Sequence, residues 1–101
     1  MISFKEKVYQ KTALIPRGQV STYGAIAGAL CHPRASRAVG NALNKNPYAP
    51  KVPCHRVIRS DGTVGGFASG TMKKIAMLKK EGIIIKKGQI DLAEYLYEFK
   101  S

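Results

Sequence analysis

Acidic residues are scarce in this chain, and long apolar runs are missing altogether. Six Asp and Glu residues stand against seventeen Lys and Arg residues, which gives a formal net charge of +11 over 101 residues. No apolar stretch approaches the roughly 18 residues that a membrane span needs, and the N-terminus has no apolar segment of the kind that signal peptides carry. These absences argue against a membrane or secreted protein, so we expect a cytoplasmic or nucleoid-associated one.

Cysteine is also rare, because Cys31 and Cys54 are the only two. Two cysteines at unrelated spacing do not form a disulfide framework, which is consistent with a reducing compartment. Each of them precedes a histidine, but no C-x2-C or H-x3-H spacing accompanies the pairs. A closed zinc site therefore has little support.

The positive charge is concentrated in the middle of the chain. Thirteen Lys or Arg residues lie from Lys7 to Lys80, where Asp61 is the sole acid, and three of the six acids lie in the last eleven residues. Such a field suits a polyanionic partner. A solvated basic surface without a partner would give the same count, and charge alone does not separate DNA from RNA or anionic lipid.

Helical periodicity and capping residues predict three helices in the first half of the chain. A capping box from Ser3 to Glu6 begins a first helix that ends near residue 14. Thr22 can cap a second helix, and Ser36 can cap a third from about residue 37 to residue 45. The second and third helices, joined by a tight turn, are typical of a helix-turn-helix.

The third helix has two different faces. Its inward face would carry Val39, Ala42 and Leu43, and its outward face a polar stripe of Arg37, Asn41, Asn44 and Lys45. An ordinary helical hairpin with a soluble face has the same pattern. The surrounding basic residues favour contact with nucleic acid instead.

The second half of the chain predicts a loop, a small hairpin and two more helices. Three prolines between residues 47 and 53 indicate an ordered, semi-rigid loop. The stretch "VIRSDGTVGG" predicts a two-stranded hairpin, and residues 83–90 predict a short strand. Thr71 can cap a fourth helix that ends at Gly82. A second capping box predicts a last helix over residues 91–99, with an inward face of Leu92, Tyr95, Leu96 and Phe99.

These elements predict a single domain over residues 1–101 of mainly α class with a small β wing. The architecture expected is a winged helix-turn-helix-like DNA-binding domain with an extra C-terminal helix.

The surroundings of Cys54 raise the question of a working nucleophile. A thiol reacts as the thiolate, and His55 is the adjacent base. Adjacent side chains in an extended segment point to opposite faces, so the chain must turn there or a water must bridge the two groups. An acid would then orient the imidazolium, and the residues alone leave Asp61 and Glu81 open. A buried structural cysteine remains the alternative, whereas a Cys-His hydrolase would not explain the charge.

Several stretches occur together in one order: "IPRGQVSTYGAIA", "SRAVGNALNKNP", "VPCHRVI", "DGTVGGFASG" and "KKIAMLKKEG". They resemble the active-site domain of the O6-alkylguanine-DNA alkyltransferases. The resemblance covers about residues 4–82 and leaves residues 83–101 as a C-terminal extension. "PCHRV" alone is moderately specific, but "RAVG" and "NP" upstream at the family's spacing make the match strong.

The resemblance implies a DNA repair protein that flips O6-alkylguanine out of duplex DNA and transfers the alkyl group, once, to its own cysteine. Cys54 would be the acceptor, and His55 would deprotonate it through a bridging water. Glu81 would hold the imidazole, which prefers Glu81 over Asp61, and Asn46 would brace the active-site turn. The expected partner is double-stranded DNA containing O6-alkylguanine, the protein would act as a monomer, and no cofactor or metal is implied.

The resemblance also implies roles on the DNA side. Arg37 would enter the duplex and fill the space of the flipped nucleotide, and Tyr23 would help to rotate the base. The further expected DNA contacts are Ser36, Gly40, Asn41, Asn44 and Lys45. The expected lining of the base pocket is Tyr23, Leu43, Val57, Phe67, Ala68 and Lys74. Arg56 and Arg59 are candidates for DNA-backbone or structural contacts.

Two departures and two rival functions accompany the resemblance. Members of the family commonly carry an additional N-terminal domain that this sequence does not show, and some have Tyr-Ser where this chain has Phe67-Ala68. The short alkyltransferase-like proteins bind alkylated DNA without transferring the group and typically carry Trp at the position of Cys54, so the cysteine favours the transferase. A plain helix-turn-helix regulator would leave "PCHRV" without a role.

Overall fold

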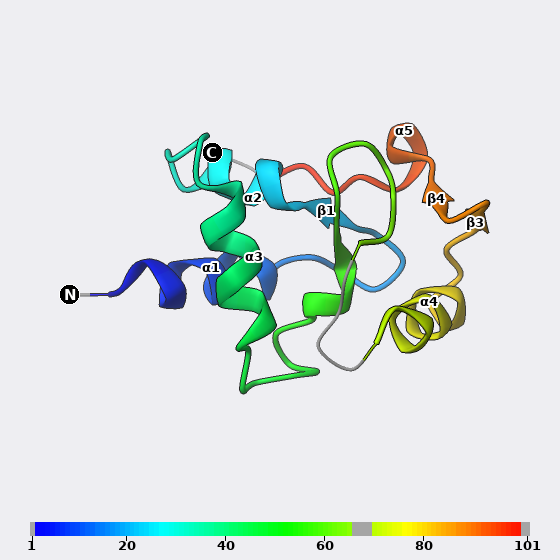
Figure 1. Cartoon of the computed structure of the whole chain (residues 1–101), viewed down its shortest axis with the longest axis horizontal. Helices are drawn as coiled ribbons and strands as arrows, with labels where there is room; N and C mark the ends of the chain where they lie inside the picture. The colour runs from blue at the N-terminus through cyan, green and yellow to red at the C-terminus, as the bar shows by residue number, and fades with distance from the viewer. Residues whose placement is uncertain (1, 66–69, 100–101) are drawn as a thin grey trace.

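The computed structural model describes residues 2–65 and 70–99, and within these ranges the chain is mainly helical with two small sheets (Figure 1). The helices are α1 (Phe4–Thr12), α2 (Tyr23–Ala29), α3 (Ser36–Asn44), α4 (Thr71–Lys80) and a short α5 (Leu92–Tyr95). The strands are β1 (Ser21–Thr22), β2 (Val57–Ile58), β3 (Ile85–Lys86) and β4 (Gln89–Ile90), and Cys54–Arg56 forms the 3-10 turn η1. The mainly α class with small β elements is confirmed.

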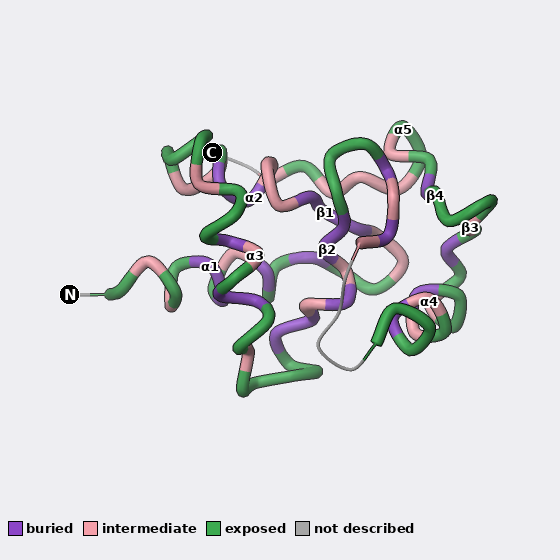
Figure 2. Tube along the Cα trace, in the orientation of Figure 1, coloured by how far each residue is buried: buried purple, intermediate pink, exposed green. Residues whose placement is uncertain are grey.

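The first three helices form one packed unit around the first of two hydrophobic clusters. The buried residues of this first cluster are Val8, Tyr9, Ile15, Ile26, Ala27, Val39, Ala42, Leu43, Val52 and Val57. α1 begins where Ser3 accepts a hydrogen bond from the Glu6 backbone N–H at 3.1 Å, as the capping box predicts. Its buried face includes Val8 and Tyr9, and the Tyr9 hydroxyl donates to the Ala42 carbonyl of α3 at 2.8 Å. α3 therefore has a fixed position on α1, with its polar stripe left exposed (Figure 2).

The predicted starts of the helices are correct for α1 and α2 but not for α3 and α4. Thr22 caps α2 by accepting from the Ala25 N–H at 3.0 Å. Ser36 is the first residue of α3 and not its cap, because the chain turns at Ala35, which has no side-chain oxygen to offer. Thr71 is likewise the first residue of α4.

A parallel pair of strands joins the helical unit to the rest of the molecule. β1 pairs with β2 in the register Ser21 to Val57, and Val20 makes a further parallel bridge to Leu96 near the C-terminus. The second hydrophobic cluster lies beside this pair. It consists of Val20, Ile58, Val64, Leu78, Ile83 and Ile90.

The predicted hairpin at residues 57–66 is wrong. The segment that begins at Val57 pairs in parallel with β1, and the turn after it delivers Thr63 to an antiparallel bridge with Gln89. The hairpin lies further along the chain instead, where β3 and β4 pair across Lys87 and Gly88. Both residues have positive φ, as tight turns between strands require.

The last helix is much shorter than predicted. Asp91 accepts from the Ala93 N–H at 3.0 Å and begins α5, but the chain leaves the helix after Tyr95. The Val20 N–H donates to the Tyr95 carbonyl, and the Tyr97 N–H donates to the Val20 carbonyl at 2.7 Å. Pairing with Val20 therefore extends this segment and overrides its helical periodicity. Tyr97 and Phe99 pack against the first cluster.

The helical unit and the β3–β4 hairpin lie at opposite ends of the molecule. The fold measures 40 × 26 × 20 Å, with α1–α3 toward one end of the long axis and α4 with the β3–β4 hairpin toward the other (Figure 1). In the described part of the chain, no helix has the length and apolar character to span a membrane.

Candidate functional site

Cys54 lies in a tight turn, as its use with His55 requires. Pro53 leads into the 3-10 turn, and the Arg56 N–H donates back to the Pro53 carbonyl at 2.9 Å. The Cys54 N–H donates to the Val52 carbonyl at 2.8 Å. The cysteine is half-buried against the first hydrophobic cluster, while His55 is only 3% exposed. The turn thus places the Cys54 thiol near the surface and the His55 imidazole in the interior.

Asn46 ties together the proline-rich loop that leads to this turn. Its amide Nδ2 donates to the Val52 carbonyl at 2.8 Å, and its Oδ1 accepts from the Tyr48 N–H at 2.9 Å. The same side chain therefore holds both ends of the loop, and the Val52 carbonyl that it binds also accepts from Cys54.

Glu81 joins the turn from the C-terminal end of α4. His55 Nε2 and Glu81 Oε2 are 2.8 Å apart. Arg56 forms a bidentate pair with the same carboxylate, through Nε to Oε1 at 2.9 Å and through a terminal nitrogen to Oε2 at 2.7 Å. Its other terminal nitrogen donates to the Ile15 carbonyl at 2.9 Å. The carboxylate is therefore held by two side chains from η1.

Electrostatics keep this carboxylate ionised. Burial raises the pKa of Glu81, but hydrogen bonds and charge from Arg56 and His55 outweigh burial and lower the pKa from 4.5 to about 2. An ionised carboxylate only accepts hydrogen bonds, so the His55 Nε2 must carry the hydrogen. The other ring nitrogen, Nδ1, is then the one with a free lone pair and can act as a base.

Lys74 is a fully buried lysine on α4. Its Nζ donates to the Val57 carbonyl at 2.6 Å and lies 5.8 Å from the centre of the Tyr23 ring. Burial lowers the pKa of Lys74 from 10.5 to about 8, which Cys54 partly offsets and Arg59 reinforces. Burial likewise raises the pKa of Tyr23. Lys74 thus links the Val57 carbonyl at the start of β2 to Tyr23, which lines an open pocket.

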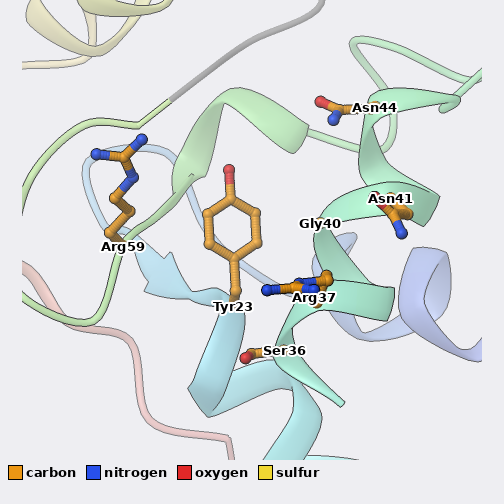
Figure 3. A pocket seen from close by; sticks show the side chains of 7 residues that line it. All are labelled: Tyr23, Ser36, Arg37, Gly40, Asn41, Asn44 and Arg59. Atoms are coloured by element: carbon orange, nitrogen blue, oxygen red, sulfur yellow. The ribbon is translucent and has the colours of Figure 1, made fainter.

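That open pocket has a volume of about 560 Å³ and lies between α3 and the segment after β2 (Figure 3). Tyr23 stands between the two walls, with its hydroxyl pointing along the pocket. Gly40 of α3 faces this ring, and a Cβ at that position would make ordinary van der Waals contact with the Tyr23 ring carbons at 3.8 Å. The lining residues are Tyr23, Ser36, Arg37, Gly40, Asn41, Asn44 and Arg59.

The structure brings together most of the residues that the sequence singled out. Six of the seven lining residues are predicted DNA contacts, and Lys45 is the exposed C-cap of α3. Leu43 and Val57 are buried in the first hydrophobic cluster, against which Cys54 and Tyr23 pack. Phe67 and Ala68 lie outside the described residues.

One open alternative from the sequence, the choice between Asp61 and Glu81, is decided by contacts. Asp61 accepts from the Thr63 N–H and hydroxyl at 3.0 and 2.7 Å, so Glu81 and not Asp61 is the acid beside His55. Over residues 2–65 and 70–99, no group of three or more His, Cys, Asp or Glu side chains is gathered as a metal site would need.

Two arginines have places that the sequence left open. Arg56 holds Glu81, and Arg59 forms part of the pocket wall opposite α3. The two arginines are three positions apart, and nothing in the sequence around them predicts that one binds Glu81 and the other lines the pocket. The difference depends on where α4 ends, because that end positions Glu81. The contact of Glu81 with η1 spans 25 and 26 positions in the sequence.

The chain matches a known family and several known proteins. The family described as 6-O-methylguanine DNA methyltransferase, DNA binding domain, matches residues 3–83. A methylated-DNA–protein-cysteine methyltransferase of Methanosarcina acetivorans is 49% identical over 79 residues, which are 78% of this chain and 51% of that protein. The chain spans about half or less of the length of the curated methyltransferases that it matches.

Two shorter relatives match over nearly the whole chain. A DNA base-flipping protein of Escherichia coli is 37% identical over 98 residues, which are 96% of this chain and 76% of that protein. The structure of Schizosaccharomyces pombe Atl1 in complex with damaged DNA containing O6-carboxymethylguanine has a TM-score of 0.87 and 34% identity. That match covers 97% of this chain and 99% of Atl1.

Proposed function

Because this chain belongs to the 6-O-methylguanine DNA methyltransferase family, we propose that it flips O6-alkylguanine out of duplex DNA and transfers the alkyl group irreversibly to Cys54. One observation carries the proposal. The turn that begins with Cys54 also holds a buried His55 whose Nε2 lies 2.8 Å from an ionised Glu81. That is the arrangement expected for an activated nucleophile.

The activation step follows from the hydrogen on His55. Glu81 fixes that hydrogen on Nε2, so Nδ1 accepts the proton of the thiol through one water molecule. The imidazolium that forms lies beside the Glu81 carboxylate, which stabilises its charge. Arg56 keeps the carboxylate in place with two further hydrogen bonds.

The transfer itself is a nucleophilic substitution at carbon. The Cys54 sulfur attacks the alkyl carbon, the bond from that carbon to guanine O6 breaks, and its electron pair stays with the base. The products are a thioether on Cys54 and a guanine that regains its proton from the site. A thioether offers no easy leaving group, so each protein molecule acts once. The step consumes one thiol and releases one guanine, so its atoms and electrons balance without a cofactor.

The pocket between α3 and the segment after β2 suits the DNA side of the reaction. Removing a nucleotide from the stack costs a few kcal/mol, and a side chain that fills its space offsets part of this. Arg37 lies on the exposed face of α3 at the pocket, where it can take that place. The net charge of +11 suits binding through phosphates without dependence on the neighbouring bases.

A second function, damage recognition without transfer, is favoured by one observation. The Atl1 structure matches 97% of the residues of this chain, whereas the M. acetivorans methyltransferase matches 78% of them. A sensor would use the same pocket and the same α3. It would leave Cys54 unmodified.

One experiment separates the two functions. The protein is incubated with duplex DNA containing a single O6-methylguanine, and its intact mass is measured. We expect a stoichiometric gain of one methyl group, about 14 Da, that maps to Cys54 and is lost in Cys54→Ala. Unmodified protein that still binds the damaged duplex would refute transfer and establish the sensor.

A companion variant tests the role of α3. Arg37→Ala should slow the reaction with duplex DNA far more than the reaction with free O6-benzylguanine, which needs no base flipping. Equal losses with both substrates would contradict insertion of Arg37 into the duplex.

A further inference from the structure

Arg59 is held in place by the backbone around it. It follows β2 directly, and its N–H donates to the Thr63 carbonyl at 3.0 Å while its own carbonyl accepts from the Gly62 N–H at 2.9 Å. This turn closes the segment between β2 and the bridge from Thr63 to Gln89. The Arg59 side chain therefore leaves a rigid part of the fold.

The stem of the Arg59 side chain runs over Gly65. A Cβ at Gly65 would lie 3.3 Å from Arg59 Cγ and 3.5 Å from its Nε, and Gly65 has a φ of +77°. The glycine thus provides a flat surface for the aliphatic part of the arginine. The guanidinium extends to the wall of the pocket that faces α3, with Tyr23 between Arg59 and Arg37 (Figure 3).

The Arg59 charge is not matched by an acid within the described structure. Asp61 is the nearest acid in sequence, and its pKa is lowered chiefly by hydrogen bonds from Thr63 and to a smaller extent by the Arg59 charge, but the two side chains form no ion pair. Over the described residues, the ion pairs are those of Glu81 with His55 and Arg56. Arg56 and Arg59 therefore differ sharply, because the first has its carboxylate inside the protein and the second points its charge at an open pocket.

The Arg59 charge also reaches Tyr23 in the pocket and the buried Lys74. It lowers the pKa of Tyr23, against the larger effect of burial, and it adds to the lowering of the Lys74 pKa by burial. An anion beside Arg59 would relieve both effects. The pocket thus has one cation on each wall, Arg37 on α3 and Arg59 opposite.

We propose that Arg59 binds a phosphodiester group of the DNA strand that carries the extruded nucleotide. The inference rests on the proposed function, since it requires a nucleotide in this pocket. A base that enters the pocket draws its own flanking phosphates to the rim, and Arg37 on α3 is assigned to the gap in the duplex. The wall opposite α3 then needs a cation for the phosphate, and a guanidinium can hold two phosphate oxygens at once.

The first test measures salt dependence in full-length protein with Cys54→Ala, so that no transfer occurs during binding. We expect Arg59→Ala to bind a duplex with one O6-methylguanine about tenfold more weakly at low salt. Its slope of log affinity against log salt concentration should fall by about 0.9, the value for one lost phosphate contact. Arg59→Lys should keep the slope and lose part of the affinity, because lysine keeps the charge but not the fork.

Lys86→Ala is the matched control. Lys86 is exposed on β3 outside this pocket, so its substitution also removes one positive charge. It should change affinity by less than about twofold. An Arg59→Ala slope equal to that of the parent or of Lys86→Ala would overturn the proposal. A merely structural Arg59 would lower the melting temperature and leave the slope unchanged.

The second test finds the phosphate. Single neutral methylphosphonates are placed at each phosphate that flanks the lesion, and binding is measured for the parent and for Arg59→Ala. At one position the methylphosphonate should weaken the parent and have no further effect on Arg59→Ala. Additive losses at every position would refute the contact.

The outcomes separate this proposal from the proposed function. A methyl gain on Cys54 without any coupling between Arg59 and a phosphate would refute the phosphate site alone. Coupling to a phosphate in a protein that gains no methyl would refute transfer and leave the phosphate site standing. Failure to bind DNA would refute both.

Discussion

Replacement of Glu81 by Gln tests the centre of the site through stability as well as activity. The lowering of the Glu81 pKa from 4.5 to about 2 corresponds to about 3 kcal/mol at about 1.4 kcal/mol per pH unit. Water near the 16%-exposed Arg56 side chain screens part of this. We therefore expect Glu81→Gln to lower the free energy of unfolding by about 2–3 kcal/mol at pH 7, because Arg56 loses its counter-charge.

The pH dependence of this loss has a definite sign. The pKa of Glu81 is lower in the folded protein than in the unfolded chain, so its contribution is complete above about pH 4.5 and disappears as the pH falls toward 2. Urea unfolding at pH 7 and pH 3 measures this directly. The difference between wild type and Glu81→Gln should fall at pH 3 to less than about half of its value at pH 7.

The control for this experiment is Glu94→Gln, the same chemical change at an exposed position of α5. It should change stability by less than about 0.5 kcal/mol. If the Glu81→Gln difference is the same at both pH values, or no larger than that of Glu94→Gln, the ion pair does not stabilise the fold. In the transfer assay Glu81→Gln should slow methylation of Cys54 by about 10²- to 10⁴-fold, since the amide carries no charge to stabilise the imidazolium and can turn its NH2 group toward His55 Nε2.

Two further predictions concern the surroundings of the site. Burial lowers the pKa of Lys74 to about 8, while the value in the unfolded chain is 10.5, so wild type should gain stability relative to Lys74→Met between about pH 8 and pH 10.5. Urea unfolding at pH 7 and pH 10 checks this. A constant difference between the two proteins would show that the folded protein fully compensates the Lys74 charge and leaves its pKa unchanged. Gly62→Ala should lower the free energy of unfolding by at least about 2 kcal/mol, because φ is +89° and the new Cβ would lie 2.8 Å from the Ile90 carbonyl oxygen. Gly88→Ala, with a φ of +75° and open space around it, should show only the smaller backbone cost in thermal melts, and equal losses for the two would contradict the contact with Ile90.

The sequence predicted the helices best where local chemistry decides them. Ser3 and Thr22 cap the helices that they were expected to cap, because the cap oxygen and the first turn are neighbours in the chain. The wing was placed wrongly because Val57 and Ile58 have the same pattern whether they pair with the next segment or with β1. The predicted length of the last helix is wrong for the same reason. The backbone of Tyr95 and Tyr97 pairs with Val20, which is distant in the sequence, and no local pattern predicts that pairing.

The candidate site divides along the same line. Cys54 and His55 were identified from the motif, and the need for a turn followed from the alternation of side chains in an extended chain. The choice of Glu81 over Asp61 required the family resemblance, because Glu81 lies 26 positions from His55 in the sequence. The role of Arg56 as the holder of Glu81 needed the three-dimensional contact. Burial of Lys74 likewise depends on how α4 lies against β2.

The order of residues from Cys54 to Arg59 shows why one short segment can serve both halves of the site. The 3-10 turn places His55 and Arg56 on Glu81, behind the thiol. The two-residue strand that follows is buried on both sides, which anchors the segment in both hydrophobic clusters. Arg59 follows that strand and lines the open pocket. A shift of β2 would therefore move His55, its contact with Glu81 and the Arg59 wall of the pocket together. Substitutions in this strand should thus affect both alkyl transfer and phosphate binding.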